Sequence, residues 1–322
     1  MIDWMWRAAP ARRLAALRIL VGAYTVAFLL ARSASFWQMA DLPSWQTEGV
    51  GVLWFLDSPW NPSTVRVAFV CTVILGILFT LGVGFRVVGP VFSLVFLVVS
   101  TYRLSFGHVI HTEHLVALHL LALGFSRSAD AWSYDARRRD PAKTPGSESR
   151  LRYGVPIRAM VLVTVLTYVL AGVAKVRHGG MDWLAGDVLR NQVAYDNLRK
   201  ELLGSPHSPF GGWVVRFEWL FPPSAVLTTI IEIGAVVALS SSQRLRTIWA
   251  VAAWGFHVMV LALMAISFPY PLSFVAYACL FDVERGGERL IQAARRRTGR
   301  TSDSKSDKLS AAISGGMPPI NG

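Results

Sequence analysis

Long apolar runs, separated by short polar or charged connections, repeat along most of this 322-residue chain. Most of the runs approach the roughly 20 apolar residues that a helix needs to cross a bilayer. We expect membrane-spanning helices at 14–33, 64–84, 87–104, 110–126, 156–176, 223–241, 246–267 and 269–283. The third, fourth and eighth of these runs are short or weak. The pattern therefore predicts an all-α fold, a polytopic transmembrane helical bundle of about eight spans.

The composition agrees with lipid as the solvent. Hydrophobic residues make up 53% of the chain and charged residues 16%, whereas a soluble domain carries about 25% charged residues. The formal net charge of +12 would suggest nucleic-acid binding in a soluble protein. Here the cations gather between and after the apolar runs, as in cytoplasmic loops of membrane proteins. We expect a multi-pass protein of the cell membrane that contacts the lipid bilayer and binds no nucleic acid.

The charged connections also predict an orientation. Cations cluster before the first run, within 127–158, between the sixth and seventh runs, and after the eighth. Eight spans place all these clusters on one side, which the positive-inside rule makes cytoplasmic, together with both termini. The two long outer connections, 34–63 and 177–222, are rich in Trp, Pro and Gly. Aromatic belts at the membrane surface explain part of this composition, and interfacial segments that cap a cavity would explain the rest.

Two regions are expected along the chain. Residues 1–283 form the transmembrane domain, and 284–322 form a basic, disordered cytoplasmic tail, because its distal part is too poor in apolar side chains to fold alone. The first part of the tail, "ERLIQAARRRTGR", suits either a stop-transfer charge cluster or an amphipathic helix on anionic lipid.

Histidines gather in "GHVIHTEHLVALHLL", residues 107–121. His108, His111 and His114 are spaced by three, which keeps neighbours on one side of a helix, and His119 follows five residues later. A hydrogen-bonded structural stripe, a proton-handling or ligand-facing role and a metal site all remain open. The metal site is the least favoured because HxxHxxH matches no standard metal signature, and we expect no bound metal.

Three further charged or titratable residues interrupt apolar runs. Glu232 and His257 each lie near the middle of a run, so a contact between them fits their depths, with either function or helix packing as its purpose. Arg18 lies only about a turn into the first run, where its side chain can reach the cytoplasmic headgroups.

Lys175 ends the fifth run on the predicted outer side. Snorkelling to the headgroups would account for it. However, the eight-span topology places His111, His114 and the turn "SFPYP" (267–271) in the same leaflet. A lysine held away from water there could act as a base toward an acid dissolved in the membrane, such as a hydroquinone.

Three stretches resemble the vitamin K-dependent gamma-carboxylases: "YVLAGVAKVRHGGMDWLAGDVLRNQV", "FHVMVLALMAISFPYPLSFVAYACLF" and, more loosely, "HTEHLVALHLL". Together with "LAALRILVGAYTVAFLL", these are similar in order and spacing to the landmarks of the HTTM domain, which that carboxylase shares with many bacterial membrane proteins. The resemblance covers about residues 10–283. It implies that Lys175 is the base that deprotonates a hydroquinone, that His114 assists carboxylation, and that His257 is the histidine before the FPY turn.

The resemblance also implies a lipid quinone as the cofactor, either reduced vitamin K or menaquinone. Position alone suggests Trp183 and Tyr270 as walls of its pocket, with His111 and Glu232 as further binding residues. The carboxylase carries a large lumenal domain that holds its protein substrate, and this chain has only a short tail in its place.

Two hypotheses from different classes follow. The first is a quinone-hydroquinone-dependent oxygenase or carboxylase that uses Lys175 as its base. The second is a non-catalytic membrane carrier or assembly partner with the same fold, acting with a protein partner whose identity the sequence does not indicate.

Overall fold

The computed structural model describes residues 4, 6–106, 112–139 and 148–288. The chain divides into two compact units, Met1–Phe281 and Asp282–Gly322. In the described part of the first unit, strand is limited to the antiparallel pair β1 (Ala9–Pro10) and β2 (Ser149–Arg150), and helices form the rest of the regular structure. The expected all-α fold is confirmed.

Six helices of the described chain are long and apolar enough to cross a membrane. They are α2 (Ala11–Ala31), α4 (Pro62–Leu81), α5 (Phe85–Leu104), α8 (Leu151–Leu184), the continuous segment of η4 (Glu218–Leu220), α11 (Phe221–Ile233) and η5 (Gly234–Leu239), and α12 (Gln243–Met264). The shorter elements are α3 (Ser33–Met39), η1 (Ser44–Gln46), η2 (Gly51–Leu53), α6 (His114–Gly124), α7 (Tyr134–Arg137), α9 (Asp187–Leu202), α10 (Pro209–Val214), α13 (Pro269–Leu272) and η6 (Val275–Leu280).

Local sequence signals set the helix ends. Before α4, the Asn61 side chain accepts a hydrogen bond from the Thr64 backbone N–H at 2.8 Å, and Pro62 occupies the first helical position. The same helix ends at Gly82, whose φ of 69° is left-handed and therefore favours glycine. These caps fix α4 within two or three residues of the expected run.

The expected fourth and eighth spans differ most from the structure, and a count of eight is not confirmed. Helix α6 has 11 residues, about half the length that a crossing helix needs. The last run forms only the short α13 and η6, because Pro269 and Pro271 interrupt the backbone hydrogen bonding and Phe274 adopts a φ of 65°.

Helix α6 nevertheless returns the chain to the end of the bundle where α5 begins. Ser93 of α5 donates to the Leu120 carbonyl of α6 at 2.7 Å. Near the ends of these segments, Gly89 and Gly124 approach so closely that a Cβ on Gly124 would lie 2.5 Å from the Gly89 carbonyl oxygen. Small residues permit this approach between apolar helices. Asp135, beyond α6, then accepts hydrogen bonds from the backbone N–H groups at the start of α5.

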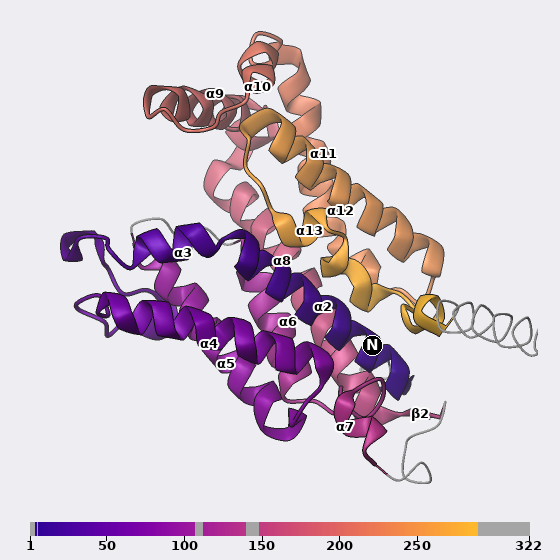
Figure 1. Ribbon diagram of the computed structural model, residues 1–322. Coiled ribbons are helices and arrows are strands. Elements are labelled where there is room, and N and C mark those ends of the chain that lie inside the picture. Colours follow the sequence, from indigo (N-terminus) through magenta and orange to yellow (C-terminus); the bar gives the residue numbers. More distant parts are fainter. Residues whose placement is uncertain (1–3, 5, 107–111, 140–147, 289–322) are drawn as a thin grey trace, which may run out of the picture. The chain divides into compact units, whose positions relative to one another are not determined.

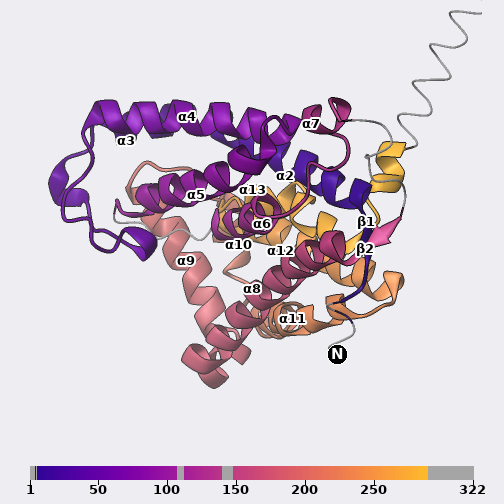
Figure 2. The same cartoon turned by 90° about the horizontal axis from the view of Figure 1, so that it is seen from below.

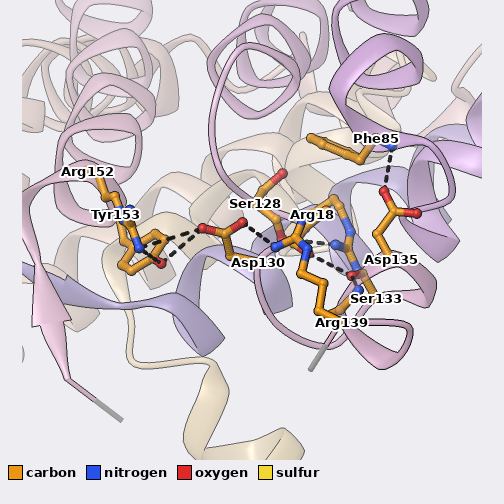
Figure 3. Close-up of polar contacts among 11 residues, drawn as sticks. Arg18, Phe85, Ser128, Asp130, Ser133, Asp135, Arg139, Arg152 and Tyr153 are labelled. Carbon is orange, nitrogen blue, oxygen red and sulfur yellow. Dashed lines mark hydrogen bonds and ion pairs between the residues drawn. The ribbon is translucent and has the colours of Figure 1, made fainter. Parts of the chain in front are cut away.

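Arg18 is the centre of the polar structure at that end of the bundle, as Figure 3 shows. Its side chain is fully buried, and its guanidinium donates to the carbonyl of Ser128 at 2.9 Å and to that of Trp132 at 2.6 Å. The expectation that Arg18 reaches the headgroups is therefore wrong. The loop after α6 folds over α2 and supplies acceptors within the protein, so the guanidinium need not extend to the membrane surface.

Helix α8 is central to the packing of the bundle. It packs against α2, α6, α11 and η6, and it passes between these elements in both views (Figure 1, Figure 2). Its first residues follow β2, which pairs with β1 beside the start of α2. The far end of α8, which carries Lys175, therefore lies at the opposite end of the bundle from the start of α2.

Candidate functional site

A break in α8 determines the surroundings of Lys175. Gly180 has φ 52° and ψ −135°, so the helix kinks shortly after the lysine. Such a φ favours glycine, which lacks the Cβ that would clash. The short helical segment beyond the kink carries Trp183, whose ring lies 5.3 Å from the Lys175 Nζ. The sequence "KVRHGGMDW" thus brings one aromatic side chain back to the lysine that precedes it.

Two other helices complete the surroundings of the lysine. Lys175 forms an ion pair with Glu232 of α11. The ring of Phe256, from α12, lies 5.2 Å from the Lys175 Nζ, a distance suited to a cation–π contact. Trp183 is held in place because its indole N–H donates to the Thr229 hydroxyl at 3.0 Å. Three segments far apart in the sequence therefore converge on one amine.

The ion pair is asymmetric in its exposure. The Lys175 side chain is 27% exposed, whereas that of Glu232 is 3% exposed. Glu232 enters the bundle next to Gly172, where a Cβ would lie 2.9 Å from the Glu232 Cβ. The second carboxylate oxygen of Glu232, Oε2, is buried and has no hydrogen-bond partner among the described residues. Burying such an atom is costly unless a partner binds it, so this oxygen is a candidate acceptor for a ligand.

The expected contact between Glu232 and His257 is replaced by two separate interactions. Glu232 pairs with Lys175, and the Nε2 of His257 lies 2.8 Å from the Tyr168 hydroxyl. Tyr168 also lies 2.6 Å from the hydroxyl of Tyr277. These three side chains form a buried polar cluster. Similar depths suggested a direct contact, but Lys175 and Tyr168, both on α8, are the partners instead.

A second buried cluster contains Tyr270, which was expected beside Lys175. The Tyr270 hydroxyl lies 2.8 Å from the Nδ1 of His119, and the Nε2 of His119 lies 3.0 Å from the Thr164 hydroxyl. His119 and Tyr270 are both fully buried. The structure therefore places Tyr270 with His119 in a hydrogen-bonded arrangement that joins α6, α8 and α13.

The other expected histidines are not brought to the lysine. His114 is exposed at the first residue of α6 and makes no hydrogen bond or ion pair with a described residue. His111 and His108 lie outside the described residues. Within the described ranges, no group of three or more His, Cys, Asp or Glu side chains could hold a metal ion.

Phe256 and Thr229 are site residues that sequence reasoning missed. Phe256 directly precedes His257 in the "FHVMV" stretch, so its place in that motif was a usable signal. Thr229 lies one turn before Glu232 on α11, and helical spacing alone puts the two on the same face. Tyr168 could also have been found from the sequence, because residues 168, 172 and 175 lie on one face of α8.

The arrangement places groups that can exchange a proton beside two aromatic rings. It combines a partly exposed amine, a buried carboxylate with one unbonded oxygen, and two aromatic rings at one end of the bundle. The Lys175 amine and Glu232 Oε2 are the atoms able to receive a proton or hold a hydroxyl. Trp183 and Phe256 are the residues suited to contact a flat ring.

Comparisons with known proteins give one match. The HTTM domain family matches residues 6–284, which is most of the chain. No curated protein and no solved structure matches it. The match and the six long apolar helices agree on a multi-pass integral membrane protein. The chain belongs to the HTTM domain family.

Proposed function

We propose that this protein is an enzyme of the cell membrane that deprotonates a reduced lipid quinone, such as menaquinol or reduced vitamin K, for a following reaction with oxygen or carbon dioxide. The single observation that carries the proposal is the Lys175–Glu232 pair. Its amine is accessible between two rings, and its carboxylate is buried with one oxygen unbonded. The similarity to the gamma-carboxylases supports the same substrate class.

The pair can act as one base. In the ion pair, the amine and the carboxylate together hold three N–H protons, and one more proton can be added on Glu232 Oε2. Moving a proton from Lys175 to Glu232 would give a neutral amine with the same capacity. The form with the neutral amine carries the step: Lys175 takes the proton of the hydroquinone hydroxyl, and the oxygen anion that results lies beside the Lys175 ammonium. The low local dielectric strengthens this attraction.

The surrounding residues have separate tasks in this proposal. Trp183 and Phe256 provide apolar faces for the quinone ring, and the bond from Trp183 to Thr229 fixes the indole. Tyr168 and His257 support the site from inside the bundle, because Phe256 and His257 are adjacent on α12 and Tyr168 lies one turn before Gly172 on α8. His257 is therefore a positioning residue here.

The proposal is tested by oxygen uptake with menaquinol in nanodiscs that contain the purified protein. The protein should raise menaquinol-dependent oxygen uptake above that of empty nanodiscs by at least about 100-fold, the lower end of the usual contribution of a positioned base. The matched control is Lys200→Ala, because Lys200 is the other described lysine and pairs with Asp196 on α9. This variant should retain the wild-type rate. Uptake no faster than in empty nanodiscs, with and without carbon dioxide, would overturn the proposal.

A further inference from the structure

We infer that a pocket between α9 and α10 binds a small zwitterionic group, an ammonium joined to a phosphate or carboxylate, at the membrane surface. The pocket has a volume of about 410 Å³. It lies in the connection between the long helices α8 and α11, where α9 and α10 pack against each other (Figure 1). This inference does not depend on the chemistry proposed for Lys175.

The floor of the pocket is held by a fixed side chain. Asn197 of α9 is buried, and its Nδ2 donates to the Leu263 carbonyl at 2.8 Å. Its Oδ1 accepts from the Ser208 backbone N–H at 2.7 Å. Asn197 therefore links α9, the start of α10 and the end of α12, so the two walls of the pocket keep a defined separation.

Two opposite charges line the pocket without being paired. Glu201 extends from α9, and Arg216 follows α10. Neither side chain has an ion pair or hydrogen bond with a described residue, whereas the neighbouring Lys200 pairs with Asp196 at 2.6 Å. A ligand with an ammonium and an anionic oxygen would satisfy both charges at once, through charge-assisted hydrogen bonds.

Apolar side chains at the same pocket indicate that the ligand carries an apolar part. Trp213 and Leu198 both line the pocket and are 51% and 56% exposed. Phe210, which stacks on Trp213 at 5.9 Å, is exposed as well. Exposed aromatic side chains of this kind are enriched at the headgroup level of membranes. This favours a phospholipid with a primary ammonium, such as phosphatidylethanolamine, over a free soluble zwitterion.

The same chemistry predicts which lipids are rejected. Phosphatidylglycerol offers an anion to Arg216 but leaves the Glu201 carboxylate without a cation. Phosphatidylcholine carries a cation without N–H donors, so it cannot form the charge-assisted hydrogen bond to Glu201. Selectivity for the primary ammonium is therefore the property that distinguishes this pocket from general adhesion to lipid.

The test is native mass spectrometry of the full-length protein in detergent with equal amounts of the three phospholipids. The wild type should retain phosphatidylethanolamine at least about tenfold better than phosphatidylglycerol. A tenfold ratio corresponds to a difference in binding free energy of about 1.4 kcal/mol. Glu201→Gln should remove most of this preference, and Arg216→Gln should lower the retention of both lipids, because both carry the phosphate that Arg216 binds. Arg199→Gln, which removes a cation from α9 outside the pocket lining, should retain it.

A second variant fills the pocket without changing charge. A Cβ added at Gly212 has no atom within 4 Å, so Gly212→Trp should fold with an unchanged melting temperature and lose the bound lipid. Equal retention of all three lipids by the wild type, or an unaffected preference in folded Gly212→Trp, would overturn the inference. Soluble phosphoethanolamine distinguishes the two sources of the ligand. If it displaces phosphatidylethanolamine at an equal concentration, the pocket binds a free zwitterion. If displacement needs a much higher concentration, the pocket binds a phospholipid.

Discussion

Replacing Lys175 with alanine is expected to lower menaquinol-dependent oxygen uptake by at least about 100-fold, which is the usual contribution of a positioned base. The substitution removes the exposed half of the Lys175–Glu232 pair and the ammonium that would lie beside the product anion. Lys175→Arg should lose nearly as much, because a guanidinium stays protonated and cannot give the neutral base. Oxygen-electrode measurements in nanodiscs report both effects.

Stability must be separated from chemistry in this experiment. Lys175→Ala leaves the Glu232 carboxylate buried without a partner, and breaking a buried pair in this way costs about 3 kcal/mol. The double variant Lys175→Met with Glu232→Leu removes both charges, so its melting temperature should return close to that of the wild type while its activity stays lost. Full turnover in Lys175→Arg, or recovered activity in the double variant, would show that the lysine only holds Glu232.

Replacing Arg18 with methionine is expected to destabilise the protein by about 3 kcal/mol, although Arg18 lies at the opposite end of the bundle from Lys175. The carbonyls of Ser128 and Trp132 would lose the hydrogen bonds that Arg18 donates. Because Arg18 is fully buried, these acceptors would have little access to water. Thermal unfolding in detergent, followed by circular dichroism, measures the loss.

A matched arginine provides the control for Arg18. Arg86 is exposed near the start of α5, and surface substitutions away from special features usually change stability by less than about 0.5 kcal/mol. Arg86→Met should therefore melt close to the wild type. Equal melting temperatures for Arg18→Met and the wild type would contradict the structural role given to the buried guanidinium.

The six long helices were predictable from the sequence because length and apolar composition identify a membrane helix without knowledge of its neighbours. The sequence did not predict which face of each helix packs against its neighbours. Lipid and protein interior are both apolar, so the pattern along α8, α11 or α12 does not state which face turns inward. The pairing of Glu232 with Lys175, in place of His257, depends on that rotation. It also depends on Gly172, whose missing Cβ admits Glu232.

The partners of the histidines in residues 107–121 could not be predicted from local spacing either. Spacing grouped His108, His111 and His114, but the structure buries His119 against Tyr270 and leaves His114 exposed. The partner of His119 comes from a distant turn, and no local pattern in α6 indicates it. Lys175 became a candidate through its expected position in one leaflet with His111, His114 and the SFPYP turn, whereas its aromatic neighbours required the kink at Gly180.

The most direct test of the central claim is the ultraviolet spectrum of menaquinol bound to the protein without oxygen. Deprotonation by the Lys175–Glu232 pair requires no oxygen, so the wild type should shift the bound menaquinol spectrum to that of its anion at neutral pH. Lys175→Ala should bind menaquinol with the spectrum of the protonated form. A wild-type complex that shows only the protonated spectrum, with binding demonstrated in the same sample, would contradict the account.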